Sequence, residues 1–369
     1  MLSLFKLFET DKFTNPRLFI ENLEKFEKAK YNTEKKWVDL YNAKLEIKDV
    51  PVFYTPYFGY PTDKTRRSGL LVPTYGLSSN EGFYFQQPIY IAPQNWWDLE
   101  LRPQIRTSRG EGLYTDFRFV DSQSSKGLLR IGYFKEQDSY VTFRNLANNR
   151  HYGYNFSYIN TSPLQDWFGI SRETQSGIYI SSSWMNDVDY MNLQRKDLIN
   201  NMISNQVYSR ANGFYANDSD YVGLYFKYYQ YLNITTEEQK KTIQTLPEVH
   251  YHHFMNTFWN NSLLTNVDFQ SNNFYRPLGK SAVESTLNIP ITFQKSLFDD
   301  YLAFSYQANM TGKYLSFSGE SLPADSFEYQ NGAYGELNHS IGLQSNLVKP
   351  YNSFVHVLTP SIGYSFGGT

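Results

Sequence analysis

The stretch "HYGYNFSYIN", residues 151–160, decides the fold class because its side chains alternate in character. One face of the extended chain is aromatic and the other is small or polar: Tyr152, Tyr154, Phe156 and Tyr158 against Gly153, Asn155 and Ser157. A period of two indicates a β-strand, and this pairing of faces is typical of a sheet between lipid and water. A soluble sandwich also alternates, although charged residues more often cover its outer face.

The same alternation recurs along the chain, for example in "YLAFSYQA" (301–308) and "LTPSIGYSF" (358–366). Turn-rich clusters such as "SSNEG" (78–82) and "DSQSSKG" (121–127) separate these runs. The longer polar stretch "MNDVDYMNLQRKDLINNMISNQ" (185–206) suits a mobile extracellular loop. If each strand with its connections takes about 20 residues, residues 50–369 hold roughly 16 strands. The sequence therefore predicts an all-β, antiparallel transmembrane barrel.

The composition supports this class. The 369 residues include 32 Tyr and 28 Phe, yet mean hydropathy is low, as expected when apolar and polar side chains alternate. Tyr and Trp also suit the membrane–water boundary. A net charge of −2 gives no support for a nucleic-acid partner. No apolar run reaches the length of a spanning helix, and the absence of cysteine excludes disulfides and thiolate metal sites within these residues.

The N-terminal region differs from the rest. "MLSLFKLFETDKF" is a poor signal peptide, because acidic residues follow its short apolar stretch at once, so we expect the true N-terminus upstream. Residues 15–30 carry helix signals, with Asn15 as a cap and Pro16 at the first helical position. From Lys36 onward the period changes to two, which predicts strands.

No catalytic motif, phosphate loop or zinc-protease motif is present, so we predict no enzyme activity and no cofactor. His250 and His252 share one strand face and His253 lies on the other. Because no further ligand group is nearby in sequence, we interpret them as interfacial or lumen-lining histidines and predict no metal site.

Basic residues are more suggestive. Arg66 and Arg67 lie beside Lys64, and Arg102 and Arg106 share strand parity. Guanidinium groups are preferred partners of phosphate, so these four arginines are candidate phosphate contacts. The alternative is a set of turn charges that keep a sheet edge soluble.

The stretch "VPVFYTPYFGYPTDKTRRSGLLVPTYG" (50–76) is strand-like but contains Pro51, Pro56, Pro61 and Pro73. Proline has no amide hydrogen for a strand ladder and is normally absent from central strands.

With residues 42–49 before it, this stretch resembles the barrel entry of the LPS-assembly outer-membrane protein family LptD, also called OstA or Imp. That family has a "VP-x-FY-x-PY" run followed by a basic "RRSG-F-L-x-P" segment. Residues 82–122 resemble the next hairpins, with two mild departures: Gln94–Trp97 precede Asp98, and Phe119 stands where Tyr is usual. "LVKPYNSFVHVLTPSIGYSF" (347–366) is similar to a later strand pair. The close match covers about residues 36–120.

The resemblance implies a barrel of about 26 strands, of which this chain would be roughly the first half. Residues 1–47 would be the remnant of a periplasmic N-terminal domain, and residues 48–369 the N-terminal part of the barrel in the Gram-negative outer membrane. The ending "SFGGT", without a final aromatic residue, fits this expectation. The implied partners are lipopolysaccharide, an LptE-like plug lipoprotein in the lumen, a periplasmic LptA-like bridge and outer-membrane lipids.

The resemblance also implies that lipopolysaccharide leaves sideways through a seam in the barrel. Each missing ladder bond forfeits about 0.5–1.5 kcal/mol, so prolines would weaken such a seam. The predicted gate residues are Pro51, Pro56, Tyr57, Pro61 and Pro73.

Two alternatives stay open at this stage. A general porin or substrate channel predicts a smooth first strand and an eyelet of opposed charges. A soluble all-β binding module predicts folding without detergent.

Overall fold

The computed structural model describes residues 28–34, 36–47, 50–62, 66–71, 73–170, 173–194, 205–321 and 328–368. The chain divides into two compact units, Met1–Arg67 and Ser68–Thr369. Each unit is described by itself.

The N-terminal unit contains a three-stranded antiparallel sheet in the order β1 (Lys28–Asn32), β2 (Trp37–Ile47) and β3 (Val50–Pro61). Val38 and Leu40 of β2 are buried and form its apolar centre. The helix expected over residues 15–30 lies outside the described residues as far as residue 27. For residues 28–30 the helix prediction is wrong, because Lys28–Lys30 pair with Asp39–Tyr41 as part of β1.

The boundary between the two compact units lies between Arg67 and Ser68, and the domain boundary expected at 47/48 stays a prediction. β3 pairs with β2 along its whole length, from Ile47↔Val50 to Trp37↔Pro61, and this ladder keeps it in the N-terminal unit. Pro51, Pro56 and Pro61 therefore lie in the three-stranded sheet. Proline is tolerated there because β3 is an edge of that strand order.

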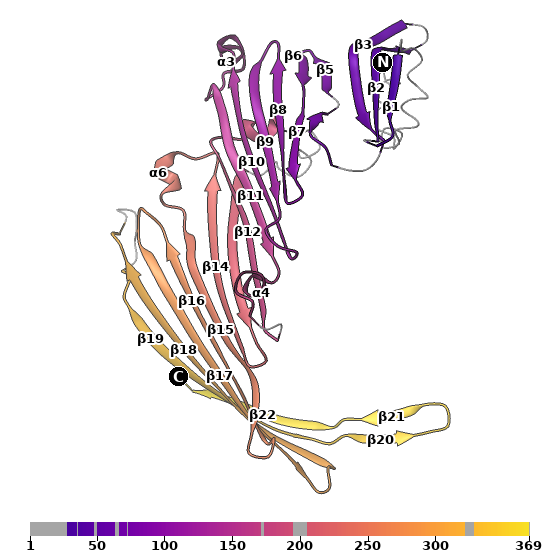
Figure 1. Cartoon of the computed structure of the whole chain (residues 1–369). Coiled ribbons are helices and arrows are strands. Elements are labelled where there is room, and N and C mark those ends of the chain that lie inside the picture. The colour runs from indigo at the N-terminus through magenta and orange to yellow at the C-terminus, as the bar shows by residue number, and fades with distance from the viewer. Residues whose placement is uncertain are drawn as a thin grey trace. The chain divides into compact units, whose positions relative to one another are not determined.

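The C-terminal unit contains one large antiparallel sheet of 17 strands, close to the sixteen expected. Its strands are β4 (Gly69–Leu70), β5 (Thr74–Ser78), β6 (Gly82–Gln86), β7 (Ile89–Gln94), β8 (Trp97–Arg106), β9 (Gly110–Phe119), β10 (Ser125–Glu136), β11 (Arg150–Asn160), β12 (Gln175–Met185), β13 (Gln206–Ala216), β14 (Asp220–Tyr231), β15 (Gln244–Phe258), β16 (Leu263–Tyr275), β17 (Ser281–Leu297), β18 (Leu302–Ser318), β19 (Gly332–Gln344) and β22 (Ser361–Gly368). From β8 to β19 each strand pairs with the next one along the chain (Figure 1). The all-β, antiparallel, barrel-like fold class is confirmed.

Short helices and one hairpin connect the strands. They are α3 (Asp138–Arg144), α4 (Pro163–Phe168), α5 (Asp189–Asn192), α6 (Thr236–Gln239), and the hairpin of β20 (Leu347–Pro350) with β21 (Val355–Leu358). The hairpin projects from the sheet in Figure 1, and β22 then returns to pair with β19. The expected strand over 358–366 is thus divided at Thr359–Pro360, because β21 ends before them and β22 begins after them. No helix in the described part of the chain has the length and apolar character needed to cross a membrane.

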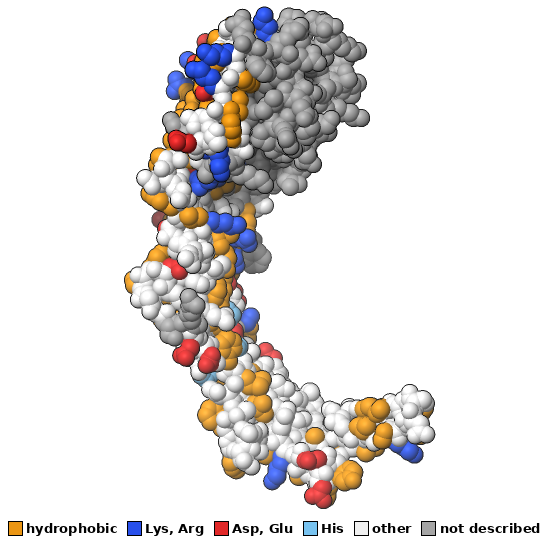
Figure 2. Space-filling model, turned by 45° about the vertical axis from the view of Figure 1, so that its right-hand side comes forward, with side chains coloured by type: hydrophobic (Ala, Val, Ile, Leu, Met, Phe, Trp, Pro, Cys, Tyr) orange, Lys and Arg blue, Asp and Glu red, His pale blue; other side chains and the backbone are white. Residues whose placement is uncertain are grey.

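The two faces of the large sheet differ as the sequence predicts. In β8 the side chains of one parity are buried and polar or charged: Asp98, Glu100, Arg102, Gln104 and Arg106. Large apolar side chains are exposed on the opposite parity of successive strands: Ile105, Leu113, Ile131, Tyr133, Tyr154, Trp184, Val222, Leu224 and Phe226. Figure 2 shows hydrophobic side chains along the sheet and clustered on the projecting hairpin. Exposed apolar side chains on strand after strand fit a surface that faces lipid.

Candidate functional site

The first two strands of the large sheet, in chain order, are each interrupted near a proline. β4 pairs with β7 (Leu70↔Ile89) and β5 pairs with β6 (Thr74↔Gln86), so β4–β5 behaves as one strand broken before Pro73. β7 and β6 both pair with β8, at Ile89↔Leu101 and Gln86↔Gln104. β6–β7 is therefore a second strand, broken at Gln87–Pro88.

The prolines of three neighbouring strands lie at the same level of the sheet. Towards β8, Gln87 and Pro88 lie between the pairs Gln86↔Gln104 and Ile89↔Leu101, which flank Pro103. Towards β4–β5, the same two residues lie between the pairs Thr74↔Gln86 and Leu70↔Ile89, which flank Pro73. Pro73, Pro88 and Pro103 each lack a ladder donor. Two backbone bonds persist at this level: Gln87 N–H donates to the Pro103 carbonyl at 3.2 Å, and Leu71 N–H donates to the Pro88 carbonyl at 2.9 Å.

The side chain of Gln87 provides an additional contact at this break. Its amide nitrogen lies 2.8 Å from the Leu71 carbonyl and 3.0 Å from the Pro88 carbonyl. A side-chain amide thus donates to carbonyls beside a position where the backbone lacks donors. The Gln87 side chain therefore adds to the ladder that joins the first two strands.

A buried ion-pair network begins at Arg102. Its guanidinium donates to Asp116 at 2.7 Å and to Glu100 at 3.2 Å, and only 2% of its side chain is exposed. Arg130 donates to the same Asp116 carboxylate at 2.9 Å and 3.1 Å. Arg118 links Glu100 to Asp98, with Nε 2.6 Å from the Asp98 carboxylate. Each buried charge is therefore paired, as burial requires.

The network continues towards the turns at the other end of β8. Arg106 and Arg109 bind the two oxygens of Glu81 at 2.6 Å and 2.5 Å. Arg109 also donates to the fully buried Glu136 at 2.8 Å, and its guanidinium lies over the rings of Phe134 and Tyr140. Burial alone would raise the pKa of Glu81, but the hydrogen bond from Arg109 and the charges of both arginines outweigh it, and the pKa is lowered.

The four candidate phosphate contacts have different surroundings. Arg102 and Arg106 share the polar face of β8, as their parity predicts, but both are buried and paired with carboxylates. Arg67 lies in the N-terminal unit with its guanidinium 5.8 Å from the centre of the Trp37 ring. Arg66 is exposed in the same unit. Arg66 and Arg67 thus belong to the N-terminal unit, and Arg102 and Arg106 to the C-terminal unit.

The predicted gate residues belong to both units. Pro51, Pro56, Tyr57 and Pro61 belong to β3 of the N-terminal unit, and Pro73 lies between β4 and β5 of the C-terminal unit. Tyr57 donates to the Asp39 carboxylate at 2.7 Å within the three-stranded sheet. Pro88 and Pro103 are not among the predicted gate residues, although "QQPIYIAP" and "LRPQIR" contain prolines within strand-like runs.

The prediction of a mobile loop over residues 185–206 is wrong for the part of this stretch that the structure describes. Residues 186–194 fold against the polar face of the large sheet, where Tyr190 and Leu193 are buried with Tyr114 and Phe134. The amide of Gln104 donates to the Leu193 carbonyl at 3.0 Å. We name residues 186–194 the inner loop. Apolar side chains within a polar sequence make it a packed segment.

Two glycines leave room for neighbouring residues: Gly132 for Tyr190 of the inner loop, and Gly153 for Met185 of β12. Gly132 of β10 and Gly153 of β11 are direct cross-strand partners. A Cβ atom at Gly132 would meet the rings of Tyr114 and Tyr190, and one at Gly153 would lie 2.8 Å from the Cβ atom of Met185. On the face of small side chains that the sequence predicts, Gly132 thus leaves a hollow, which we call the cradle, for the rings of Tyr114 and Tyr190.

Asp187 fastens the inner loop to β11. Its carboxylate accepts hydrogen bonds from His151 Nδ1 at 2.8 Å, from the Asn148 amide at 2.9 Å and from the backbone N–H of Tyr190 at 3.2 Å. His151 Nε2 in turn lies 3.1 Å from Glu136. Burial alone would raise the pKa of Asp187, but the hydrogen bonds from His151 and Asn148 outweigh it and lower the pKa.

This shift predicts that the inner loop loosens in acid. Because the pKa of Asp187 is lower in the folded protein than in the unfolded chain, its stabilising contribution is complete above the unfolded value of about 3.9. It is lost as the pH falls from about 4 through the folded value. We expect hydrogen exchange of residues 186–194 to accelerate over that range. Asp187→Asn should remove the pH dependence and Asp189→Asn should keep it; an unchanged profile in Asp187→Asn would contradict the assignment.

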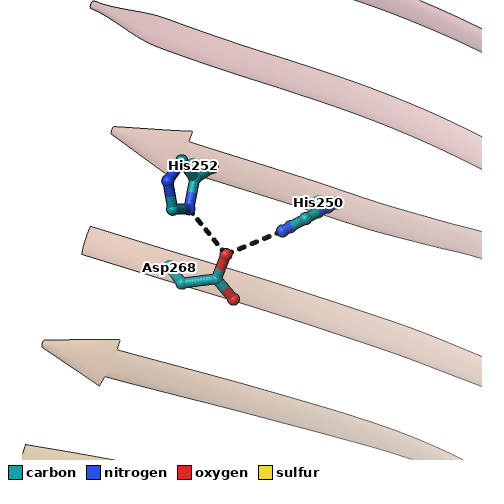
Figure 3. A group of neighbouring side chains, drawn as sticks. All are labelled: His250, His252 and Asp268. Atoms are coloured by element: carbon teal, nitrogen blue, oxygen red, sulfur yellow. Dashed lines mark hydrogen bonds and ion pairs between the residues drawn. The ribbon is translucent and has the colours of Figure 1, made fainter. Parts of the chain in front are cut away.

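His250, His252 and Asp268 meet on the polar face further along the sheet. His250 Nε2 and His252 Nδ1 of β15 lie 2.8 Å and 2.9 Å from the same carboxylate oxygen of Asp268 on β16 (Figure 3). Their three possible ligand atoms lie within 4.8 Å of one another. His253 lies on the opposite face, with Nδ1 2.8 Å from Asp220. The third group, Asp268, comes from the neighbouring strand β16, so the residues next to the histidines in the sequence did not indicate it.

Comparison with known proteins connects the chain to one family. A family model described as LptD, LPS transport system D, matches residues 150–367, and a second, described as LptD protein, matches residues 40–211. The chain is 30% identical over 239 residues to the LPS-assembly protein LptD of Shewanella oneidensis, covering 64% of this chain and 28% of that relative.

Two further relatives carry the same name. The protein of Pasteurella multocida is 35% identical over 136 residues, which cover 36% of this chain and 17% of that relative. The protein of Coxiella burnetii is 39% identical over 108 residues, which cover 29% of this chain and 12% of that relative. The chain thus matches a minor part of the length of each of the three relatives.

Proposed function

The chain belongs to the LptD family of LPS transport proteins, and we propose on that premise that it helps deliver lipopolysaccharide to the outer leaflet of the outer membrane. The large sheet would span the membrane with its apolar face towards lipid and its polar face towards the lumen. The N-terminal unit would lie on the periplasmic side. These assignments rest on the family, on the two faces of the sheet and on the broken first strands.

The break at Pro73, Pro88 and Pro103 is the observation that supports the proposed transport mechanism. In a closed barrel every strand edge is paired, which retains a lipid inside the lumen. Missing donors at one level of the first strands weaken the ladder there. We propose that this level is where the sheet opens laterally, so that acyl chains pass into the membrane while sugars stay in the lumen. Pro73 is retained from the predicted gate, and Pro88 and Pro103 are added.

The proposed partners follow from the same arrangement. An LptE-like lipoprotein would occupy the lumen against the polar face of the sheet. An LptA-like bridge would reach the N-terminal unit, where all five residues of β1 are exposed at the end of the strand order. Strand addition to an exposed sheet edge is a common mode of recognition. Arg66 would be the arginine of the candidate set with the side chain most accessible to a phosphate.

A general porin fits the charges less well. Such a channel needs opposed charges that line open water, whereas Arg102, Arg109 and Asp116 are paired and almost completely buried. The interrupted first strands also differ from the smooth strand that a porin requires. The ion-pair network therefore supports the wall of the sheet and the inner loop.

Restoring donors at the break is expected to slow lipid release. In Pro73→Ala/Pro88→Ala, two regained bonds would favour the closed ladder by about 1–3 kcal/mol, which is roughly 5- to 150-fold in its opening equilibrium. The measurement is surface lipopolysaccharide and uptake of large antibiotics in a strain that depends on this gene.

Pro290→Ala is the matched control for this experiment, because Pro290 lies in the middle of β17, where its partner is Asn309 of β18 and not a residue of the first strands. It should leave both readouts unchanged. Equal surface lipopolysaccharide in the double variant and the control, at equal protein level, would contradict the gate. Depletion of the gene without loss of surface lipopolysaccharide would contradict the transport function itself.

A further inference from the structure

The cluster of His250, His252 and Asp268 has the donor set of a transition-metal site. Imidazole nitrogens and a carboxylate oxygen are the ligands of many zinc sites, and two histidines with one carboxylate also bind other divalent ions. Three different groups from two paired strands converge on one point, which Figure 3 shows directly.

The distances are close to those that an ion requires. Both ring nitrogens lie within 2.9 Å of one Asp268 oxygen, and all three donors lie within 4.8 Å of one another. In a tetrahedral site with metal–ligand bonds of about 2.0–2.1 Å, neighbouring donors are about 3.3 Å apart. To admit the ion, the donor pairs now 2.8 Å and 2.9 Å apart would lengthen by about 0.5 Å, and the widest pair, at most 4.8 Å apart, would shorten by up to about 1.5 Å, which rotation of the partly exposed side chains supplies. Each ring would present a lone pair where it now contacts Asp268 and carry its proton on the other nitrogen.

The rings are held in their orientation by aromatic neighbours. Tyr221 contacts His250 edge to face at 5.6 Å between ring centres, and Phe254 contacts His252 in the same way at 5.3 Å. The two imidazoles themselves lie 6.4 Å apart in a further edge-to-face contact. Four rings in a row restrict rotation of the ligands, which lowers the entropy cost of binding.

The cluster is open on one side and has a favourable charge. The side chains of His250, His252 and Asp268 are each about a third exposed, so an ion can reach them. With neutral imidazoles the three ligands carry one negative charge, and a dication would find one or more further positions free for water or an anionic oxygen. Bound metal with an open position is the arrangement of a reactive or ligand-binding site.

We propose that His250, His252 and Asp268 bind a divalent transition-metal ion, for which Zn²⁺ is the probe, on the polar face of β15 and β16. The site is independent of the proposed transport function, because its argument uses only these three side chains and their neighbours.

The test is a Zn²⁺ titration of the full chain in detergent, in competition with a chromophoric chelator. We expect one bound ion per chain whose affinity falls by more than about 100-fold in His250→Gln/His252→Gln, since even substitutions outside the ligand set cost 10–100-fold. Asp268→Asn should weaken binding in the same direction. Co²⁺ should give the visible absorption of a low-coordinate site, absent from the double variant.

His253→Gln is the matched control, since His253 is the next residue, is similarly exposed and contacts an aspartate on the other face. It should bind Zn²⁺ as the parent chain does. Heat-modifiable migration of every variant verifies folding. Equal affinity in the parent chain and the double variant, or equal loss in His253→Gln, would overturn the proposal.

Discussion

Arg102→Met is expected to lower the free energy of unfolding by about 3–5 kcal/mol, the range found when one partner of a buried ion pair is removed. Arg102 joins Asp116 and Glu100, whose side chains are 1% and 5% exposed, so water cannot replace its hydrogen bonds. Methionine keeps much of the volume and therefore isolates the loss of charge. Arg130 and Arg118 remain as partners, which places the expected value towards the lower end of that range.

The measurement is urea-induced unfolding of the protein reconstituted in lipid vesicles. Lys240→Met is the control, because Lys240 and Glu237 form an exposed ion pair in which 47% and 69% of the two side chains are exposed. An exposed pair contributes about 0–1 kcal/mol, so the control should unfold close to the parent protein. If both variants lose the same amount, burial does not determine the strength of this network.

Tyr190→Ala is expected to release the inner loop, with a loss of about 3–5 kcal/mol for a large buried aromatic side chain. Tyr190 is completely buried, and its ring lies 5.9 Å from that of Tyr114 in the cradle above Gly132. Truncation leaves a cavity that the paired glycines cannot fill. We expect rapid hydrogen exchange in residues 186–194 and new protease cleavage there.

Phe168→Ala serves as the comparison for this second experiment. Phe168 ends α4 and is 70% exposed, so its removal should change stability by less than about 0.5 kcal/mol. Exchange in the inner loop should stay slow in this variant. The packing model of the inner loop fails if Tyr190→Ala shows the same slow exchange.

Much of the fold was predictable from local pattern. Alternation over residues 151–160 predicts a strand whose bounds the structure places at Arg150–Asn160. The shared parity of Arg102 and Arg106, and of His250 and His252, is confirmed because side chains of a strand alternate between faces whatever the partner strand is. The one clear failure in a connection is the inner loop, where Tyr190 and Leu193 outweigh a polar composition.

The candidate sites were predictable only in part. Proline content pointed to the first strands, but nothing local distinguishes Pro56, which lies in β3 of the N-terminal unit, from Pro73, which lies between β4 and β5 of the C-terminal unit. Arg102 was identified as a cation, yet its partner Asp116 is 14 residues away on the next strand. Asp268 likewise reaches His250 and His252 only through the register of two strands.

The sequence by itself determined what each strand presents to its two faces, since that depends on a backbone period of two. It also determined the family, through motifs that lie along one continuous stretch. Only the tertiary structure decided which charges neutralise one another, which prolines share a level and which loop folds inward. Those outcomes depend on strand register, and a shift of one residue would exchange the two faces while leaving every local pattern unchanged.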